Sequence, residues 1–316
     1  MNRPIISVVM PVYNGSKVLA SSIESILSQK GVLFEFIIIN DGSTDESEEI
    51  INLYMAKDSR IKVINQSNQG ITKALINGCR AAKGEYIARQ DVGDISLPGR
   101  LKAQLEAMRS NSRLVLISTS TRFTTPKGEL LYTNDQSPDQ LQAGLMLSDD
   151  QSLNGPPHHG STMFLRAAYN NVGGYRAQFE VAQDLDLWTR LIEVGDVTTL
   201  EHVYYEATLE ANSISAQKRD QQVATTEIIK SCIVARASGL SDSAALEQLS
   251  NLKRTQTDDQ KSKPSALADY YYYLGSNLFD TNPEASLSYL VKSFKLKPAR
   301  WKTILKILYL QAKKLL

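Results

Sequence analysis

The sequence of 316 residues has only two cysteines, Cys79 and Cys232, which stand far apart without a CxxC pair or a histidine–cysteine zinc spacing. This scarcity excludes a disulfide scaffold and a structural zinc site, and it is typical of a reducing compartment. No stretch reaches the roughly 18 apolar residues that a membrane-spanning helix needs. The first residues also lack the layout of a signal peptide. We therefore expect a soluble, cytoplasmic chain.

An excess of charge of one sign is also missing, since 35 lysines and arginines stand against 34 aspartates and glutamates, for a net charge of +1. This balance gives no overall electrostatic reason to bind nucleic acid. Phosphate loops of the GxGxxG and GxxxxGK[ST] types are absent, which disfavours a nucleotidyltransferase. What remains is a globular composition, with 42% apolar and 22% charged residues. The length corresponds to roughly two domains.

Strand and helix signals alternate over the first hundred residues. Apolar runs typical of buried strands occur at residues 5–10, 34–39, 61–64 and 85–88, with helical patterns between them. Ser43 and Glu46 have the spacing of a capping box for the second helix. The alternation predicts an α/β fold with a Rossmann-like, mostly parallel sheet flanked by helices. Such sheets bind ligands beyond the carboxyl ends of their strands, where polar clusters stand in this sequence.

The rest of the chain divides into a less regular stretch and a helical extension. Between residues 96 and 215 we expect helices at 98–108 and 184–193 and two short strands, 114–119 and 122–124. Helical patterns follow at 217–237, 243–252, 266–279, 284–294 and from about 301, with a polar linker at 254–264. The predicted organisation is a first domain at 1–215, a helical linker region at 216–263 and a helical region at 264–316. The last region contains one hairpin like a tetratricopeptide repeat, packed on the first domain or on a partner.

Four clusters of residues resemble the inverting nucleotide-sugar glycosyltransferases of family 2, which have the GT-A fold. They are residues 9–14 (VMPVYN), 39–45 (INDGSTD), 84–98 (GEYIARQDVGDISLP) and 183–188 (QDLDLW). The resemblance covers about residues 4–215. It implies transfer of a sugar from a nucleoside diphosphate donor, a UDP-sugar, to a hydroxyl of a glycan or glycolipid, with inversion. The expected process is the synthesis of a cell-surface polysaccharide.

The resemblance implies a nucleotide site at the ends of the first strands. In the family the carboxylate at Asp41 binds the base of the nucleotide, and the residues beside it shape the pocket; a turn without a ligand is the alternative. A second segment begins the next helix beside the nucleotide, where a helix N-terminus and a lysine suit a diphosphate. The residues expected to bind the nucleotide-sugar are Pro11, Tyr13, Asn14, Asp41, Asn68, Gly70, Lys73 and Asp91.

The resemblance also implies a divalent cation, Mn²⁺ or Mg²⁺, bound to the diphosphate and held by an Asp-x-Asp motif. This chain keeps Asp91 but has Gly93 where the second aspartate is usual, and Asp94 stands one residue further on. We expect Asp91 and Asp94 to hold the cation. Arg89 and Arg100 flank this loop and are expected to neutralise phosphate directly.

The catalytic base implied by the resemblance is Asp184, which takes the proton of the acceptor hydroxyl. Gln183 replaces the glutamate that often precedes this aspartate, and Asp186 is a second candidate for the catalytic base. His159 is expected either on the acceptor side of the cleft or as a structural donor in a turn. Residues 212–215 resemble the segment that closes the catalytic domain.

The final stretch is basic, because eight lysines and arginines follow Glu284 and no acidic residue does. Together with an apolar side, this predicts either a helix lying on the anionic inner face of a membrane, where lipid-linked acceptors are found, or ordinary packing with a solvated face. A competing interpretation of the whole chain is a catalytically degenerate transferase that acts as a scaffold through its helical tail. Gly93, Gln183 and Glu210 favour that alternative.

Overall fold

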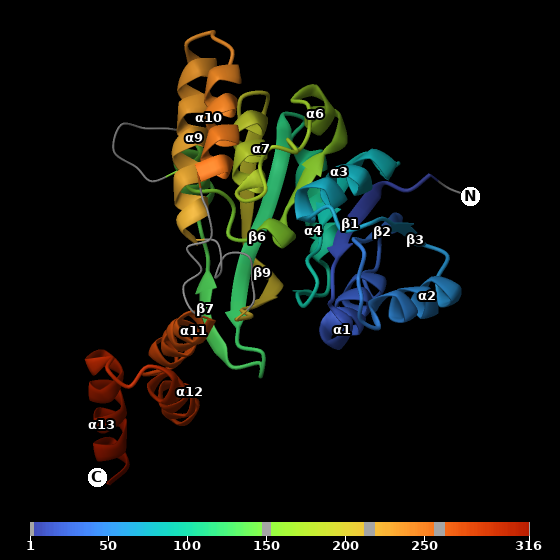
Figure 1. Cartoon of the computed structure of the whole chain (residues 1–316). Helices are drawn as coiled ribbons and strands as arrows, with labels where there is room; N and C mark the ends of the chain where they lie inside the picture. The colour runs from blue at the N-terminus through green and yellow to red at the C-terminus, as the bar shows by residue number, and fades with distance from the viewer. Residues whose placement is uncertain (1–2, 147–152, 212–218, 256–262, 316) are drawn as a thin grey trace.

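In a computed structural model, the described residues (3–146, 153–211, 219–255 and 263–315) form one nine-stranded sheet with helices on its faces (Figure 1). The strand order is β3-β2-β1-β4-β8-β6-β9-β5, and β7 pairs with β6. The strands are β1 (Ile6–Val12), β2 (Phe34–Asn40), β3 (Ile61–Asn65), β4 (Tyr86–Arg89), β5 (Ile95–Ser96), β6 (Leu114–Thr124), β7 (Leu130–Asn134), β8 (Met163–Leu165) and β9 (Asp196–Thr208).

Helices connect these strands and continue past the last of them. The first group is α1 (Ser16–Leu27), α2 (Ser47–Lys57), α3 (Ile71–Ala81), α4 (Arg100–Ser110), α5 (Pro138–Leu145), α6 (Arg166–Asn171) and α7 (Gln183–Leu191). A single 3-10 turn, η1, spans His159–Ser161. The second group is α9 (Arg219–Ala237), α10 (Ser243–Thr255), α11 (Lys263–Asn277), α12 (Pro283–Leu296) and α13 (Trp301–Leu315). The predicted α/β class and the helical extension are confirmed.

Alternating side chains of the central strands supply a separate core on each face of the sheet. From β1, Val8 and Met10 pack with α1, α2 and α4 on one face, and Val9 packs with α3, α5 and α7 on the other. The period of two along a strand produces this division. A strand covered on both faces is apolar throughout, which is why these strands are recognised from the sequence as continuous apolar runs.

The sheet is parallel from β3 to β4 and mixed beyond it. The pairs of β8 with β4 and with β6 are antiparallel, as are β7 with β6 and β5 with β9. The prediction of two short strands at 114–119 and 122–124 is wrong, because β6 runs unbroken through them. Ser120 and Thr121 resemble a turn in the sequence, yet they are fully buried and pair with Val203 and Tyr205 of β9.

The predicted capping box of α2 is also wrong. Ser43 Oγ accepts a hydrogen bond from the Asn14 N–H instead, and α2 begins only at Ser47. Asp45 caps two helices, because its carboxylate accepts from the N–H groups of both Ser16 and Ser47. Burial alone would raise the pKa of Asp45, but its hydrogen bonds to Ser47 and Ser16 lower it to about 2. The loops after β1 and β2 are therefore locked together, which fixes the edge of the sheet where the site lies.

The helical extension, which begins with α9, packs on the first domain in two places. Phe179 and Leu153 contact Ile229 and Cys232 of α9, and Leu131 of β7 packs with Leu274 and other residues of α11 and α12. The expected packing of the helical hairpin on the first domain is thus confirmed, and Figure 1 shows α11 to α13 at one end of the molecule. Among the described residues, no helix combines the length and the apolar character needed to cross a bilayer.

Candidate active site

The carboxylate of Asp41, which follows β2, is buried and holds the loop that leads into α3. Its Oδ1 accepts hydrogen bonds from the Gln66 side chain at 2.6 Å and the Gln69 N–H at 2.9 Å. Its Oδ2 accepts from the Gly70 N–H at 2.9 Å. A carboxylate oxygen accepts about two hydrogen bonds, so Oδ2 retains capacity for one more donor. Asp41 therefore holds the turn, and its Oδ2 keeps the capacity to accept one further hydrogen bond.

Asn14 connects the two loops next to Asp41. It has a left-handed backbone (φ 51°), which asparagine tolerates better than most residues, and its Oδ1 accepts from the Thr44 N–H at 2.7 Å. The neighbouring Tyr13 is 53% exposed, so its ring is open to solvent at the same edge. Pro11 lies further back, in β1, paired in register with Ile39.

Asn68, Gly70 and Lys73 are exposed around the start of α3. Gly70 has a φ of 85°, a conformation that glycine adopts readily, and it turns the chain into the helix. An added Cβ at Gly42 would lie 2.7 Å from the Asn68 backbone nitrogen, so the loops after β2 and β3 touch. The structure thus brings the predicted nucleotide residues of three loops to one edge, beside a helix N-terminus that favours anions.

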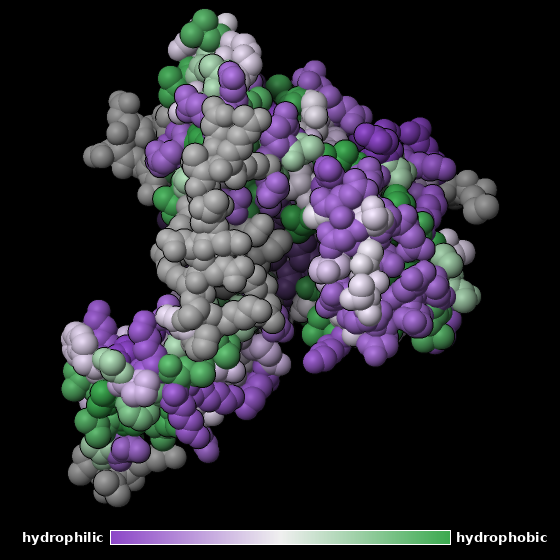
Figure 2. All heavy atoms as spheres, in the orientation of Figure 1, coloured by the Kyte–Doolittle hydropathy of each residue, from purple (hydrophilic) through white to green (hydrophobic). Residues whose placement is uncertain are grey.

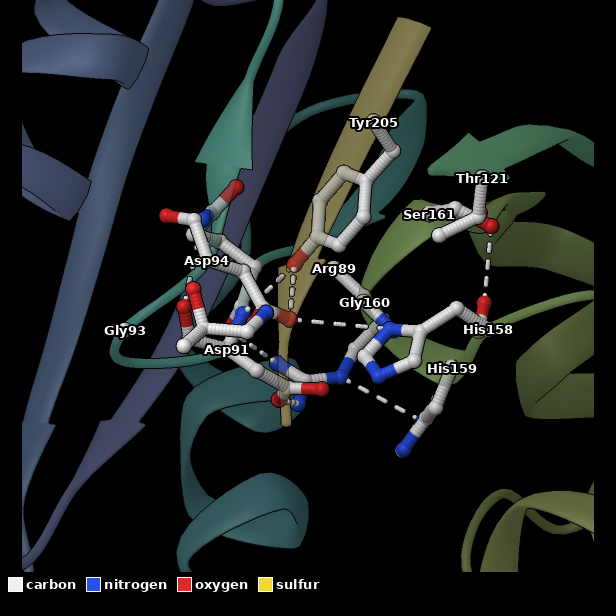
Figure 3. Close-up of polar contacts among 12 residues, drawn as sticks. Arg89, Asp91, Gly93, Asp94, Thr121, His158, His159, Gly160, Ser161 and Tyr205 are labelled. Atoms are coloured by element: carbon white, nitrogen blue, oxygen red, sulfur yellow. Dashed lines mark hydrogen bonds and ion pairs between the residues drawn. The ribbon is translucent and has the colours of Figure 1, made fainter. Parts of the chain in front are cut away.

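The expectation that Arg89 and Arg100 face a phosphate is wrong, because both side chains are fully buried. Arg89 donates to Asp91 Oδ1 at 2.7 Å and from Nε to His159 at 3.3 Å. Arg100 donates to Ser96 Oγ at 2.6 Å and to the Arg89 carbonyl at 2.7 Å. A buried guanidinium must satisfy its donors within the protein, so these arginines hold the site from inside the fold. Figure 3 shows Arg89 beside Asp91 and His159.

Asp94 is nearly buried and is held by β9. Its Oδ2 accepts from the Tyr205 hydroxyl at 3.0 Å, and its Oδ1 accepts from the Thr208 N–H at 3.1 Å. Burial and the negative charge of Asp91 raise the pKa of Asp94 well above its usual value. Asp91 differs, because Arg89 lowers its pKa although burial acts in the opposite direction. The pKa of Asp91 is therefore lowered and that of Asp94 raised, although the two residues are neighbours.

The side chains of Asp91, Asp94 and His158 form a candidate cation site, with one ligand atom from each lying within 4.8 Å of the others. Carboxylate oxygens suit Mg²⁺ and Mn²⁺, and a neutral imidazole adds a nitrogen ligand. Burial lowers the pKa of His158, which keeps its ring neutral. Its Nδ1 also accepts from the Gly160 N–H at 3.1 Å, so a cation would compete with that bond. The two carboxylates therefore fit such a cation better than the histidine does.

Asp184 lies in the first turn of α7 with a quarter of its side chain exposed. Its Oδ1 accepts from the Leu185 N–H at 2.9 Å, and its Oδ2 is 3.9 Å from His159 Nδ1. Burial raises the pKa of Asp184 to about 6. A partly exposed carboxylate with raised proton affinity is suited to accept a proton near neutral pH.

His159 lies between Asp184 and the pair formed by Arg89 and Asp91. Because Arg89 Nε can only donate, His159 Nε2 must be the accepting nitrogen, and the proton is therefore assigned to Nδ1, which faces Asp184. The Tyr175 hydroxyl is 2.7 Å from the same Nε2. Burial and the Arg89 charge lower the pKa of His159 to about 3. The ring is thus neutral, and its Nδ1 lies near the candidate base at 3.9 Å, a distance longer than a hydrogen bond.

Asp186, the second candidate for the base, is fully buried. Its Oδ2 pairs with Arg190 at 2.6 Å and with Arg176 at 3.5 Å. A carboxylate enclosed by two guanidinium groups cannot reach an acceptor in solvent. The geometry therefore favours an anchoring role for Asp186, within the helix that carries Asp184.

Three residues of this cluster were not predicted: His158, Tyr175 and Tyr205. Two of the 3 histidines of the chain stand side by side at 158–159, and this doublet is the signal that could have pointed to His158. Tyr205 comes from β9, a strand that the sequence pattern did not reveal, and Figure 3 shows its hydroxyl beside Asp94. The closing segment expected at 212–215 lies outside the described residues.

Comparison with known sequences gives a match to the family described as Glycosyl transferase family 2 over residues 7–172. The chain is 28% identical to a chondroitin synthase of Escherichia coli over 219 residues, which are 69% of this chain and 31% of the synthase. It is 35% identical to a putative glycosyltransferase, EpsE, of Bacillus subtilis over 200 residues, 61% of this chain and 68% of that protein. The chain thus spans about a third of the chondroitin synthase's length.

Among solved structures, residues 1–349 of S. aureus TarS in complex with UDP match with a TM-score of 0.56 and 17% identity, over 98% of this chain and 90% of that one. The same protein in complex with UDP-GlcNAc matches with a TM-score of 0.55 and 16% identity, over 98% and 91% of the two chains. At this identity the likeness establishes the fold alone. The family match covers more than half of the sequence, and the chain therefore belongs to glycosyltransferase family 2.

Proposed function

We propose that this glycosyltransferase moves a sugar from a UDP-linked donor to a hydroxyl of a glycan or glycolipid, with inversion, in the synthesis of a cell-surface polysaccharide. One observation carries the proposal. His159 lies between Asp184, a candidate base with a raised pKa, and the Arg89–Asp91 pair beside the candidate cation site, with its Nδ1 3.9 Å from the Asp184 carboxylate. The TarS structures with UDP and UDP-GlcNAc support the nucleotide, and the chondroitin and hyaluronan synthases among the relatives support the process.

The donor would lie along the edge formed by the loops after β1, β2 and β3. Asp41 Oδ2 would accept a hydrogen bond from the base, while Tyr13 and Pro11 border the pocket and Asn14 keeps its two loops together. The exposed Asn68, Gly70 and Lys73 would approach the ribose and the diphosphate at the α3 N-terminus. Asp91 and Asp94, with His158, would hold Mg²⁺ or Mn²⁺, which stabilises charge on the departing diphosphate when bound.

Asp184 would act as the base in a single displacement. The acceptor oxygen attacks the anomeric carbon from the face opposite the diphosphate, and its proton passes to Asp184. The bond from that carbon to the diphosphate oxygen breaks, and the electron pair leaves with UDP. The Nδ1–H of His159 lies 3.9 Å from Asp184, and a small shift of either side chain would let it hold the carboxylate toward the acceptor.

We further propose residues 1–215 as the transferase domain, with 216–263 as a helical linker region and 264–316 as a helical extension. The buried thiols of Cys79 and Cys232 are unpaired, which is consistent with a cytoplasmic location. Asp139, an exposed carboxylate in the first turn of α5, offers a matched control for the experiment that follows.

The experiment measures release of UDP from a panel of UDP-sugars, together with UDP binding by calorimetry with and without Mn²⁺. We expect Asp184→Asn to lower the rate by at least about a hundredfold with UDP affinity unchanged, since proton transfer to a positioned base contributes about 10²–10⁴-fold. Asp139→Asn should behave like the wild type. A rate within a few-fold of wild type in Asp184→Asn would sink the assignment of the base. A failure of UDP to bind in either condition would exclude the donor and favour the scaffold alternative.

A further inference from the structure

Helix α13 exposes an apolar face, which is unusual for a helix at a protein surface. Trp301, Leu305, Leu308 and Tyr309 are each more than half exposed, at 63%, 55%, 55% and 57%. Their spacing of three and four residues places them on one side of the helix, and Ile304 adjoins them. Figure 2 shows apolar side chains gathered over the part of the surface that α12 and α13 form. Such a patch is typical of an interaction surface.

Helix α13 packs on the rest of the protein through its other side, which leaves the apolar face exposed. Thr303 and Leu310 are buried, at 0% and 3% exposure, on the side opposite Leu305 and Leu308. The Lys306 ammonium lies 4.5 Å from the ring centre of Phe279. The helix is therefore seated on the extension, and its apolar face points outward.

The charged side chains of α13 itself are all basic. Eight basic residues follow Glu284, and no acidic residue does: Lys292, Lys295, Lys297, Arg300, Lys302, Lys306, Lys313 and Lys314. Lys302 and Lys313 are exposed and border the apolar face, because they lie about 100–120° around the helix from its centre. Arg300 is the exception in the described part, since it pairs with Asp269. The surface around the apolar side chains thus favours an anionic partner.

We propose that α13 lies in the interface of an anionic lipid bilayer, with Trp301, Leu305 and Leu308 inserted among the lipids and Lys302 and Lys313 at the level of the phosphates. The combination of an apolar face with flanking lysines and an exposed tryptophan is what such helices require. A second copy of the chain would bring two basic surfaces together, and this repulsion disfavours self-association through the same face. The inference goes beyond sugar transfer and does not depend on the donor.

The test measures binding of the full chain to vesicles of phosphatidylcholine alone and of phosphatidylcholine mixed with phosphatidylglycerol. We expect sedimentation with the mixed vesicles only, weakened by added salt because the lysines contribute through charge. Trp188 is buried and Trp301 is exposed, so a blue shift in tryptophan emission on binding reports Trp301. Trp301→Phe should remove this shift while sedimentation persists, which locates the contact at α13.

Two variants separate the apolar and the charged contributions. Leu305→Glu combined with Leu308→Glu should abolish sedimentation, whereas Leu53→Glu, at a 53% exposed site on α2, should leave it unchanged. Lys302→Glu should weaken binding by more than about fivefold, since each basic residue near an anionic surface contributes about that factor.

Equal sedimentation of the wild type and the double leucine variant would overturn the proposal. A different set of results would also overturn it: the wild type is a dimer by light scattering and does not bind vesicles, and the double variant is a monomer. A second copy of the chain would then cover the apolar face. UDP-sugar turnover without acceptor should be the same in all variants. Its loss would report on the proposed transfer function and not on the membrane contact.

Discussion

At the scale of single residues, environment gives identical side chains different acidities. The pKa of Asp91 is lowered by Arg89 against the effect of burial, while burial and Asp91 raise that of Asp94, and burial raises that of Asp184 to about 6. His159 stays neutral because burial and Arg89 lower its pKa to about 3. A base needs proton affinity, which the raised pKa of Asp184 supplies, and a cation ligand must be ionised, which suits Asp91. A cation bound at Asp94 would have to displace the proton that the raised pKa favours.

The raised pKa of Asp184 predicts a pH dependence of catalysis. The base must be ionised to accept a proton, so kcat/KM should fall about tenfold per pH unit below about pH 6 and level off above it. The measurement is UDP release at limiting UDP-sugar and saturating Mn²⁺. UDP affinity measured at each pH separates this effect from loss of the cation, and a kcat/KM that is flat down to about pH 5 would contradict the assignment.

The raised pKa of Asp184 also makes the stability of the fold depend on pH, and stability falls over the pH range in which the base becomes active. A carboxyl whose pKa is higher in the folded chain stabilises the fold below its unfolded value of 3.8, and this contribution is lost as pH rises through about 6. Asp184→Asn removes the buried charge and should therefore raise the free energy of unfolding by about 1–3 kcal/mol at pH 8. Unfolding of the wild type and the variant by urea at pH 8 and at pH 5 measures the difference, which should be smaller at pH 5 and vanish only as pH falls to the unfolded value of 3.8.

At the scale of elements, helix α7 is positioned by what lies beneath it. It begins after Ala182, which has a left-handed backbone (φ 53°) that costs energy for a residue with a Cβ. Asp186 pairs with Arg190 within the helix and with Arg176 outside it, and Arg176 pairs in turn with Asp242 before α10. The extension therefore helps to hold the helix that presents Asp184.

This network predicts a large effect on folding for Asp186→Ala. The change leaves the buried Arg190 guanidinium without its carboxylate, while Arg176 keeps its pair with Asp242, so the free energy of unfolding should fall by about 3–5 kcal/mol. Asp196→Ala removes an ion pair with Arg113, whose side chain is 79% exposed, and should cost less than about 1 kcal/mol. Chemical unfolding of both variants checks the prediction, and equal losses would show that the buried network contributes no more than a surface pair.

At the scale of the whole molecule, the candidate site is assembled from both halves of the sheet. Asp41 and Asp91 follow strands of the parallel half, whereas Tyr205 comes from β9 in the mixed half, and His158 and His159 come from the turn before β8. Gly160 lets these parts approach closely, because an added Cβ there would lie 2.1 Å from the Tyr205 hydroxyl and 3.0 Å from Asp91 Oδ2. A ligand at this junction contacts both halves and should stabilise the whole fold.

Mass action predicts the size of that stabilisation. At 100 times its Kd, UDP with Mn²⁺ should raise the free energy of unfolding by about 2.7 kcal/mol, visible as a higher and concentration-dependent Tm. Lys73→Met should shift the effect to higher UDP concentrations. Removal of the metal with a chelator should reverse the Mn²⁺-dependent part, and a Tm that ignores UDP with and without Mn²⁺ would contradict a donor site at this edge.

The sequence by itself determined the parallel half, the helical extension and the main carboxylates. Buried parallel strands are continuous apolar runs, and amphipathic helices repeat every three to four residues. Asp41, Asp91 and Asp184 were expected because the short motifs around them resemble those of family 2. These signals depend on neighbours in the sequence, and a short window is enough to detect them.

Only the tertiary structure decided which side chains meet and which are buried. Arg89 and Arg100 look like surface cations in the sequence, yet carbonyl and carboxylate partners enclose them in the core. Tyr205 reaches Asp94 across 111 residues of sequence, through a strand whose alternation is broken by charged residues and register shifts. Burial and long-range pairing depend on the packing of distant segments, and that packing sets the acidity of Asp184 and the orientation of His159.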